Sequence, residues 1–519
     1  LPPVPPSPQK GSSPSPLSSD ALLDTVLSTL RRIVGADVPP TTPLMQAGLD
    51  SLGTLELRDA LAAATGLGGL PPTLAFDHPT PLALAAELAE RLAKIHGGGD
   101  AVVVVKKAAA EVDVLSPAIP TTAPPHARVV RVVAAAGHFP PAPPPPAGSP
   151  HHPRVPGTGL ASFWAALAGG VSLQAPTPLD RWDVDAAYDP DGGATTVSVR
   201  LAAWAPSFDA LDPAALGLAP PDAVALDPQA RRLLELAGEV LHGAGADAPP
   251  HSKTGTFVGC MFWDAADVAR RAYGSPATGP LMTGVGAPYL AGRAAFTYDL
   301  AGPCHGIDTA CSSSLVAAHA GRAAVAGGEC GGALVGGVNA MLWVGTTAGI
   351  CALQALSRSG RCRTFDAAAD GYGRGEGFGV VLLASGGDSG GGGRAPLALL
   401  AGSAVNQDGR SASLIAPSGP AQRTLVAAAL ASGGLAASAV ASVIVHGTGT
   451  PLGDPIEVGA LAGALGGDGG GSGSAAPHAP PSLASVKATY GHTEGAAGVK
   501  GLLAALASLR ARLTPPVTG

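Results

Sequence analysis

The stretch GIDTACSSSL, residues 306–315, decides how the rest of this chain is interpreted. It places Cys311 between small residues and directly ahead of a run typical of a helix. A thiolate at the N-terminus of a helix is favoured because the helix macrodipole stabilises an anion there. Free cysteine is also among the most buried residue types, so a purely structural role is the competing hypothesis. The other motifs of the chain must decide between the two.

The composition of the chain excludes some classes of function. The chain has 519 residues, which is enough for more than one domain, with 46% hydrophobic and 13% charged residues and a formal net charge of −7. The negative balance argues against a nucleic-acid partner or an anionic membrane surface. No uninterrupted apolar run is long enough to span a bilayer. We therefore expect no nucleic-acid partner and no membrane span.

The cysteines bear on compartment and metal content. They form no CxxC pair and no metal-ligand spacing with histidine, so no metal site is expected. Scattered free thiols in a large chain suit a reducing compartment, and a cytoplasmic location is predicted. The chain begins with a Pro/Ser-rich stretch and no Met, so it is expected to be a piece of a longer protein, and an organelle remains an alternative. The six are Cys260, Cys304, Cys311, Cys330, Cys351 and Cys362.

Local patterning divides the chain into four parts. Residues 1–17 are a low-complexity linker, 18–95 are helical, 96–128 are a second linker, and 129–519 form an α/β domain. Three apolar stripes at helical spacing predict a small helical bundle in the second part. Their members are Leu23, Val26, Leu27, Leu30 and Val34, then Leu52, Leu55 and Ala62, then Leu84, Leu88 and Leu92.

Strand-like apolar runs alternate with Ala/Leu-rich helical runs beyond the second linker. This alternation predicts an α/β domain with largely buried sheets. The runs are residues 129–137, 254–259, 331–342, 377–384 and 441–447.

The stretch GLDSLGTLELRDAL, residues 48–61, carries Ser51 at the head of the second helix. A serine there is ordinarily an N-cap. In the context of a small bundle, however, residues 18–95 closely resemble an acyl carrier protein of the multidomain polyketide synthase type. The resemblance implies a small all-α bundle of the four-helix type. It also implies 4′-phosphopantetheine esterified to Ser51, with Asp50 in the motif recognised by a phosphopantetheinyl transferase.

Further stretches point to one enzyme family. HGTGT (446–450), GDPIE (453–457) and GHTEGAAGVKG (491–501) follow DTACSSSL in that order. A lone histidine in any of them would be interpreted as structural. Together they resemble the β-ketoacyl synthase family of condensing enzymes in its polyketide synthase branch, over about 129–519. The resemblance implies a thiolase-like fold, with two related α/β halves stacked in five layers, and a homodimer.

The resemblance also assigns roles, and it makes Cys311 the expected nucleophile, acylated from a carrier thioester. His446 and His492 would hold the enolate formed when a malonyl-type extender loses carbon dioxide. Lys487 would support His492, with Glu457 as its partner. The serines after Cys311 are expected to cap and line the helix start. Supporting positions are expected at Thr448, Thr450, Thr493 and Glu376.

The chain departs from the family at three positions. It stops at RLTPPVTG, where family members continue with a last strand pair and a Gly-rich loop, so a C-terminally truncated and impaired synthase is expected. Thr489 and Gly292 stand where relatives commonly carry Asn. Losing a buried amide costs about 1 kcal/mol or more. Because the Cys, both His and the Lys are present, we interpret these changes as drift.

A carrier followed by a synthase is the order found at a module boundary. We therefore expect a polyketide synthase segment, an acyltransferase of the β-ketoacyl-[acyl-carrier-protein] synthase type. Its partners would be acyl and malonyl-type thioesters on carriers and other domains of the parent polypeptide. A fatty-acid or polyunsaturated-fatty-acid synthase segment is one alternative. A carrier and scaffold fragment with an inactive truncated synthase is the other.

Overall fold

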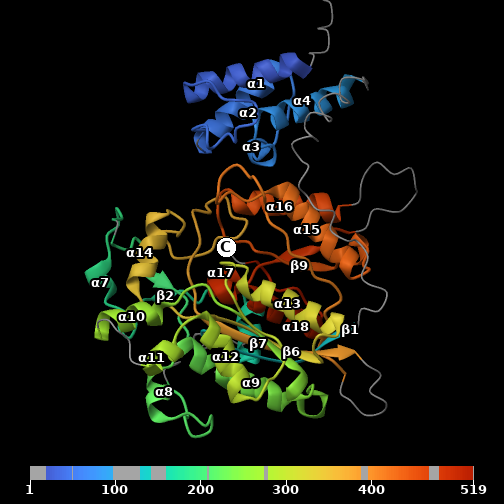
Figure 1. Cartoon of the computed structure of the whole chain (residues 1–519). Helices are drawn as coiled ribbons and strands as arrows, with labels where there is room; N and C mark the ends of the chain where they lie inside the picture. The colour runs from blue at the N-terminus through green and yellow to red at the C-terminus, as the bar shows by residue number, and fades with distance from the viewer. Residues whose placement is uncertain are drawn as a thin grey trace, which may run out of the picture. The chain divides into compact units, whose positions relative to one another are not determined.

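The computed structural model places two compact units, drawn in Figure 1. One comprises residues 1–119 with 407–421, and the other comprises 120–406 with 422–519. The structure describes residues 19–49, 51–96, 129–141, 159–193, 195–206, 210–273, 279–386, 395–466 and 479–517. The two expected linkers therefore lie outside the described residues, apart from His96 at the end of a helix.

The carrier region is helical, as its stripes predict. Pro81 begins the last helix, where a missing N–H costs nothing because first-turn amides have no intrahelical partner. The helices are α1 (Ser19–Val34), α2 (Ser51–Thr65), the short α3 (Leu74–Asp77) and α4 (Pro81–His96).

The apolar core of the carrier region differs from the expected stripes in detail. Leu22, rather than Leu23, is fully buried on α1, and Leu55 on α2 is exposed, while Leu57 and Leu61 fill the core. The predicted stripes on these two helices were therefore partly wrong about which face is buried. On α4, Leu84 and Leu88 are buried as expected.

A six-stranded sheet forms the centre of the larger unit, in the order β5-β4-β6-β7-β1-β8. β4, β5 and β6 run parallel to one another, whereas β7 is antiparallel to both β6 and β1. All residues of β4 and β6 are buried, which explains why these strands are continuous apolar runs. The strands are β1 (Val129–His138), β4 (Thr254–Gly259), β5 (Cys304–Ile307), β6 (Gly332–Asn339), β7 (Gly377–Gly386) and β8 (Ala398–Leu399).

Helices cover both faces of this sheet (Figure 1). The apolar side chains of α9 and α12 pack on one face, and those of α13 and α18 pack on the other. Their bounds are α9 (Pro228–Ala244), α12 (Ala287–Thr297), α13 (Ser313–Gly327) and α18 (Ala497–Ala511). A Cβ added at Gly259 would come within 2.3 Å of the Ser314 backbone nitrogen, so only glycine lets β4 approach the start of α13.

A second, smaller sheet lies beyond α18, where β9 (Ser442–Ile444) pairs in parallel with β10 (Ser482–Ala484). Leu461 and Leu465 of α16 pack with Val445 beside this sheet, together with apolar residues of α15. Figure 1 shows the succession α12 and α9, large sheet, α13 and α18, β9, then α15 and α16. The outer helices are α15 (Gly419–Ser432) and α16 (Gly453–Leu465).

Short elements complete the described chain. The helices are α6 (Leu160–Ala168), α7 (Val184–Ala187), α8 (Pro220–Ala225), α10 (Asp264–Tyr273), α11 (Gly279–Gly284), α14 (Val344–Ala352) and α17 (Lys487–Tyr490). The 3₁₀ turns are η1 (Gly245–Asp247), η2 (His251–Lys253), η3 (Ala437–Ala439) and η4 (Glu494–Ala496), and β2 (Ala175–Pro176) pairs with β3 (Leu201–Ala202).

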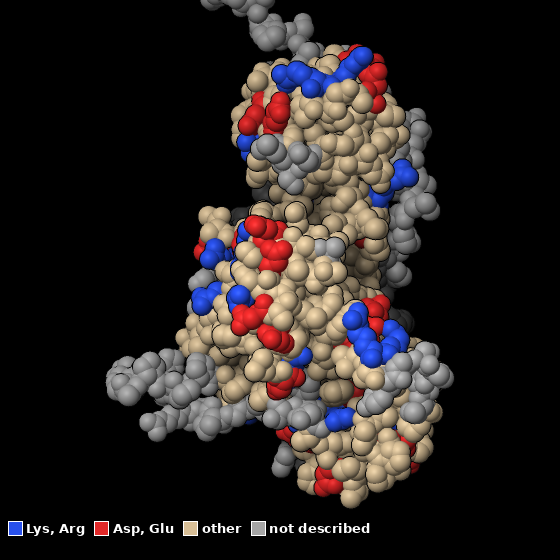
Figure 2. Space-filling view, turned by 90° about the vertical axis from the view of Figure 1, so that its left-hand side faces the viewer, with Lys and Arg blue, Asp and Glu red and all other residues tan. Residues whose placement is uncertain are grey.

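Charged side chains are sparse on the surface. In Figure 2 the acidic and basic groups on the visible face form small clusters of both signs, separated by uncharged surface. Within the described ranges, no helix combines the length and the apolar character needed to cross a bilayer. The same ranges contain no cluster of three or more His, Cys, Asp or Glu suited to a metal ion.

Candidate active site

Cys311 lies in the loop that joins β5 to α13, one residue before the N-cap Ser312. Ala310, just before it, has φ +56°, a left-handed conformation that a non-glycine residue rarely adopts. Hydrogen bonds hold this turn, because the Ala310 N–H donates to Asp308 and the Ser313 hydroxyl donates to the Ala310 carbonyl at 2.6 Å. The thiol is therefore presented on a braced turn at the start of a 15-residue helix.

The three serines after Cys311 brace the loop. Ser312 donates to the Thr309 carbonyl at 2.8 Å and makes no side-chain capping bond to α13. The Ser314 hydroxyl accepts from the Val499 N–H at 3.0 Å and so links α13 to α18. The expectation that these serines cap the helix was wrong for Ser312. They fix the backbone on both sides of the nucleophile position.

The charges around Cys311 do not favour a resting thiolate. Burial raises the pKa of the Cys311 thiol, the nearby Glu494 carboxylate raises it further, and Lys487 lowers it. Because the raising effects dominate, the expected lowering of the pKa at the helix start is outweighed. The thiol is the resting form.

His446 and His492 meet, although they come from different segments. His446 follows β9, and His492 follows α17. Their rings lie 5.4 Å apart between centroids and are almost perpendicular, at 88°. The His492 ring also lies in an edge-to-face arrangement with the Tyr372 ring, at 5.1 Å between centroids. The structure thus brings the two sequence-predicted histidines together.

The hydrogen bonds of His492 determine its tautomer. The Glu494 backbone N–H donates to Nδ1 of His492 at 3.0 Å, so Nδ1 carries no proton. Burial, with the positive charges of Lys487 and its neighbours, lowers the pKa of His492 well below its usual range, so the ring is neutral. The proton therefore resides on Nε2, which is buried and has no hydrogen-bond partner among the residues that the structure describes. An unpartnered buried donor costs about 1–3 kcal/mol, which suggests a ligand atom for it.

Lys487 lies at the centre of the set. It is 3% exposed, and its Nζ donates to the backbone carbonyl of His446. Its positive charge lowers the pKa values of His446 and His492, and it also acts on the Cys311 thiol. One buried cation therefore acts electrostatically on all three other predicted catalytic residues.

Glu457, the expected partner of Lys487, interacts with it through charge but not through a direct hydrogen bond. Glu457 accepts instead from the backbone N–H groups of His446 and Gly447, at 2.6 and 2.8 Å. No ion pair within 4 Å joins Lys487 to Glu457 in the described part of the chain. The two charges still stabilise one another across the His446 backbone, which both of them hold.

The predicted supporting threonines lie at the same end of the domain. The hydroxyls of Thr448 and Thr450 are 3.2 Å apart, and Thr450 accepts from the Gly453 N–H at the start of α16. Thr493 is buried, and its hydroxyl has no partner. Thr448 and Thr450 therefore hold the loop after His446, while Thr493 adds a second unpartnered polar group beside His492.

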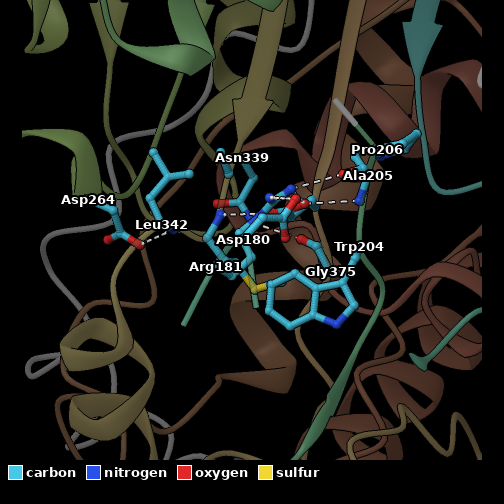
Figure 3. A network of polar contacts seen from close by, with 12 residues as sticks. Asp180, Arg181, Trp204, Ala205, Pro206, Asp264, Asn339, Leu342 and Gly375 are labelled. Atoms are coloured by element: carbon cyan, nitrogen blue, oxygen red, sulfur yellow. Dashed lines mark hydrogen bonds and ion pairs between the residues drawn. The ribbon is translucent and has the colours of Figure 1, made fainter. Parts of the chain in front are cut away.

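Glu376 belongs to a different cluster, that of Arg181 and Ala205, two residues that Figure 3 labels. Both of its oxygens bind the Arg181 guanidinium, at 2.9 Å each, and they also accept from the N–H groups of Ala205 and Met341. The pair is almost fully buried. Both carboxylate oxygens of Glu376 are occupied by this network, so its arrangement is that of a residue that stabilises the fold.

Two buried residues escaped the sequence analysis. Arg374 and Glu494 form a bidentate ion pair, at 2.6 and 2.8 Å, directly beside His492. A signal was present, because each is a charged residue two positions from a residue that was singled out, Glu376 and His492 respectively. Asp50 lies outside the described residues, and Ser51 is the first residue of α2.

Three family models match the chain. They are the phosphopantetheine attachment site over residues 20–88, the N-terminal domain of β-ketoacyl synthase over 153–388, and the C-terminal domain over 397–519. The chain belongs to the β-ketoacyl synthase family. It also carries a phosphopantetheine attachment domain, and therefore covalently bound 4′-phosphopantetheine, ahead of the synthase. Family members of this type are acyltransferases that catalyse condensation.

Curated relatives are modular polyketide synthases. The chain is 38% identical over 505 residues to polyketide synthase GfsA of Streptomyces halstedii, covering 96% of this chain and 6% of that protein. It is 39% identical over 514 residues to the spectinabilin polyketide synthase system protein NorA′ of Streptomyces orinoci, covering 95% and 12%. The chain thus spans about a tenth of the length of these relatives.

Solved structures support the fold. The oxazolomycin ketosynthase domain OzmH KS7 of Streptomyces albus JA3453 matches with a TM-score of 0.65 and 30% identity, over 75% of this chain and 64% of that one. The ketosynthase from module 6 of the bacillaene synthase of Bacillus subtilis 168 matches with a TM-score of 0.62 and 27% identity, over 75% and 62%. The thiolase-like ketosynthase fold and the carrier domain expected from the sequence are confirmed. The family model of the C-terminal domain matches residues 397–519. The predicted C-terminal truncation stays a prediction.

Proposed function

We propose that this chain is a carrier–ketosynthase segment of a polyketide synthase, in which Cys311 accepts an acyl group and the two histidines support condensation with a malonyl-type extender. One observation carries the proposal. The His492 Nε2–H is a buried donor without a partner, and it lies beside His446 and within the electrostatic reach of the charges that act on Cys311. A developing enolate oxygen is the kind of acceptor that such a donor suits.

The first step is transfer of an acyl group from a carrier thioester to Cys311. The sulfur attacks the thioester carbonyl, the carbon–sulfur bond to the carrier breaks, and the departing sulfur takes the proton that the Cys311 thiol gives up. Because the thiolate is the nucleophile and the pKa of Cys311 is raised, the proton must leave the sulfur as the attack takes place. The Cys311 N–H at the helix start would donate to the carbonyl oxygen as it becomes negative.

The second step forms the carbon–carbon bond. When the extender loses carbon dioxide, negative charge moves to its thioester oxygen, and N–H groups of His446 and His492 would hold it. The enolate carbon then attacks the acyl thioester on Cys311, and the cysteine sulfur leaves. Lys487 keeps both rings neutral by lowering their pKa values, and Glu457 fixes the backbone of His446. Thr448 and Thr450 support the same loop.

Ser51 is the proposed attachment residue for the cofactor. It begins α2, a 15-residue helix whose first backbone amides have no intrahelical partner, and this environment suits a phosphodiester. When bound, 4′-phosphopantetheine supplies a thiol that carries acyl groups as thioesters. We propose that a phosphopantetheinyl transferase recognises Asp50 and Ser51. We also propose the domain bounds 18–95 and 129–519, which contain the matched ranges.

A homodimer through the synthase is the proposed assembly. β5 is an edge strand of the large sheet, and three of its four residues are exposed. Phe296 on the adjoining α12 is 82% exposed, and Leu315 on α13 is also exposed. An unpaired edge with apolar neighbours suits strand pairing across a two-fold axis. All six cysteines are free, in keeping with the proposed cytoplasmic location.

Mass spectrometry of peptides tests the proposal directly. The chain is incubated with an acyl thioester that mimics a loaded carrier, and the Cys311 peptide should gain the acyl mass. Cys311→Ala should lose this labelling, while the other five cysteines serve as internal controls. Absence of labelling in a folded protein whose Ser51 accepts phosphopantetheine would leave a carrier attached to an inactive synthase and would refute the catalytic claim.

A further inference from the structure

Glu494 has an unusual backbone. It follows His492 by two residues and begins η4, and its φ of +43° lies in the left-handed region. A non-glycine residue in this region is strained by about 1 kcal/mol or more, so the surrounding structure must hold it. Its backbone N–H donates to Nδ1 of His492 at 3.0 Å, and its left-handed φ sets the direction in which the chain and the Glu494 side chain leave that N–H.

The Glu494 side chain is held by a buried ion pair. Arg374 donates from Nε and Nη2 to the two carboxylate oxygens, at 2.6 and 2.8 Å, and from Nη1 to the Thr347 hydroxyl at 2.6 Å. Arg374 is 3% exposed and Glu494 is fully buried. Two parallel bonds fix the carboxylate in orientation as well as position.

The same segment also holds the His492 backbone. The His492 N–H donates to the Gly373 carbonyl at 2.7 Å, and the Gly375 N–H donates to the His492 carbonyl at 2.9 Å. These two bonds flank Arg374 on either side. The backbone of His492 and the side chain of Glu494 are therefore anchored to the same three residues, and the ring between them has little freedom to turn.

We propose that Arg374 and Glu494 form a positioning pair that anchors the turn after His492, keeps the Glu494 N–H on Nδ1 and thereby fixes the His492 tautomer with the proton on Nε2. This inference rests on the proposed function, in which that N–H holds the enolate oxygen. Neither residue touches substrate in this role. Without the pair, the turn relaxes, the bond to Nδ1 weakens, and the proton distributes between the two ring nitrogens.

The electrostatics of the site agree with this role. Arg374 lowers the pKa of His492, and Glu494 raises that of Cys311. As a closely paired couple the two charges largely cancel at a distance. Removing both charges together therefore changes the field at the site less than removing one, and it leaves no buried charge unpaired.

The test uses matched double variants. Arg374→Met with Glu494→Gln removes the positioning pair. Arg181→Met with Glu376→Gln removes the other bidentate, buried Arg–Glu pair of the domain, which makes no hydrogen bond to His492. Both variants lose a comparable ion pair, so a general loss of stability affects both. Circular dichroism and thermal unfolding establish that each variant is folded.

The decisive readout is the His492 tautomer, measured by ¹⁵N NMR of the full chain with ¹⁵N-labelled histidine and assigned by comparison with His492→Gln. Wild type and the Arg181/Glu376 variant should show one tautomer, with the proton on Nε2. The Arg374/Glu494 variant should show a tautomer mixture, and its condensation kcat should fall about tenfold or more while acylation of Cys311 is retained. If the Arg374/Glu494 variant keeps the single tautomer, the inference is refuted. If wild type shows that tautomer but does not condense, the proposed function fails and the positioning inference stands.

Discussion

Replacing Lys500 by Met should stabilise the ketosynthase domain, and the gain should shrink as the pH rises. Lys500 lies in α18 and is fully buried, and within the described part of the chain its Nζ has no hydrogen-bond partner. The amine instead faces the rings of Tyr490, at 4.3 Å, and Phe139, at 5.6 Å. Burial and the charge of Lys487 lower the pKa of Lys500 well below 10.5, while Cys362 opposes the shift weakly.

Three contributions set the size of the gain. An unpartnered buried donor costs about 1–3 kcal/mol, which Met removes. Repacking a thioether in place of the amine costs less than about 1.5 kcal/mol. The third is linkage. Between the folded and the unfolded pKa of Lys500, the unfolded chain binds a proton that the folded chain does not. Within that range, each unit by which the pH falls destabilises the wild type by about 1.4 kcal/mol.

Urea unfolding followed by tryptophan fluorescence measures the effect. All five tryptophans lie beyond residue 129, so the signal reports the synthase and not the carrier. Over a pH series from about 7 to 9, the difference in unfolding free energy between Lys500→Met and wild type should fall as the pH rises, by up to about 1.4 kcal/mol per pH unit. Lys253→Met, at an exposed lysine, is the control and should change stability little at either pH. A pH-independent difference, or a destabilised Lys500→Met at neutral pH, would refute the reasoning.

Other predictions concern the active site. His492→Gln should lower the condensation rate about 10²- to 10³-fold while acylation of Cys311 continues, as separate assays of the two steps would show. Lys487→Met should raise the pKa values of His446 and His492, because it removes the cation that lowers both. Since protonated Nδ1 of His492 cannot accept from the following amide, the acidic limb of the pH–rate profile for condensation should then move to higher pH. Glu457→Ala should destabilise the domain by about 1–3 kcal/mol in chemical unfolding, because two backbone N–H groups lose their acceptor.

The sequence predicted the fold well where burial dictates the pattern. β4, β6 and β7 coincide with apolar runs because both faces of these strands are covered. On the carrier helices the pattern was less decisive, since several leucines compete for one face, and Leu55 is exposed. Periodicity reports which side of an element is buried only when polar residues clearly mark the other side.

The catalytic set was predicted from motif resemblance, and local sequence could not have placed it. His446 and His492 lie on separate loops, and only the tertiary fold brings their rings to 5.4 Å. The hydrogen-bond partners of the site residues were harder to predict than the residues themselves. Lys487 and Glu457 look like an ion pair in sequence, but each binds the His446 backbone, because those polar groups are nearer and also need partners.

The electrostatics of the site favour developing negative charge. Burial lowers the pKa of His492, and the positive charges of Lys487 and Arg374 lower it further, while Lys487 and burial lower that of His446. Of these cations, Arg374 makes a direct ion pair with a carboxylate, that of Glu494. Burial and the nearby charge of Lys487 both oppose the uptake of another proton, so the histidines stay neutral. The same charge stabilises an enolate or an oxyanion that appears only during the reaction. The charge of Lys487 thus contributes both to the low histidine pKa values and to the proposed condensation chemistry.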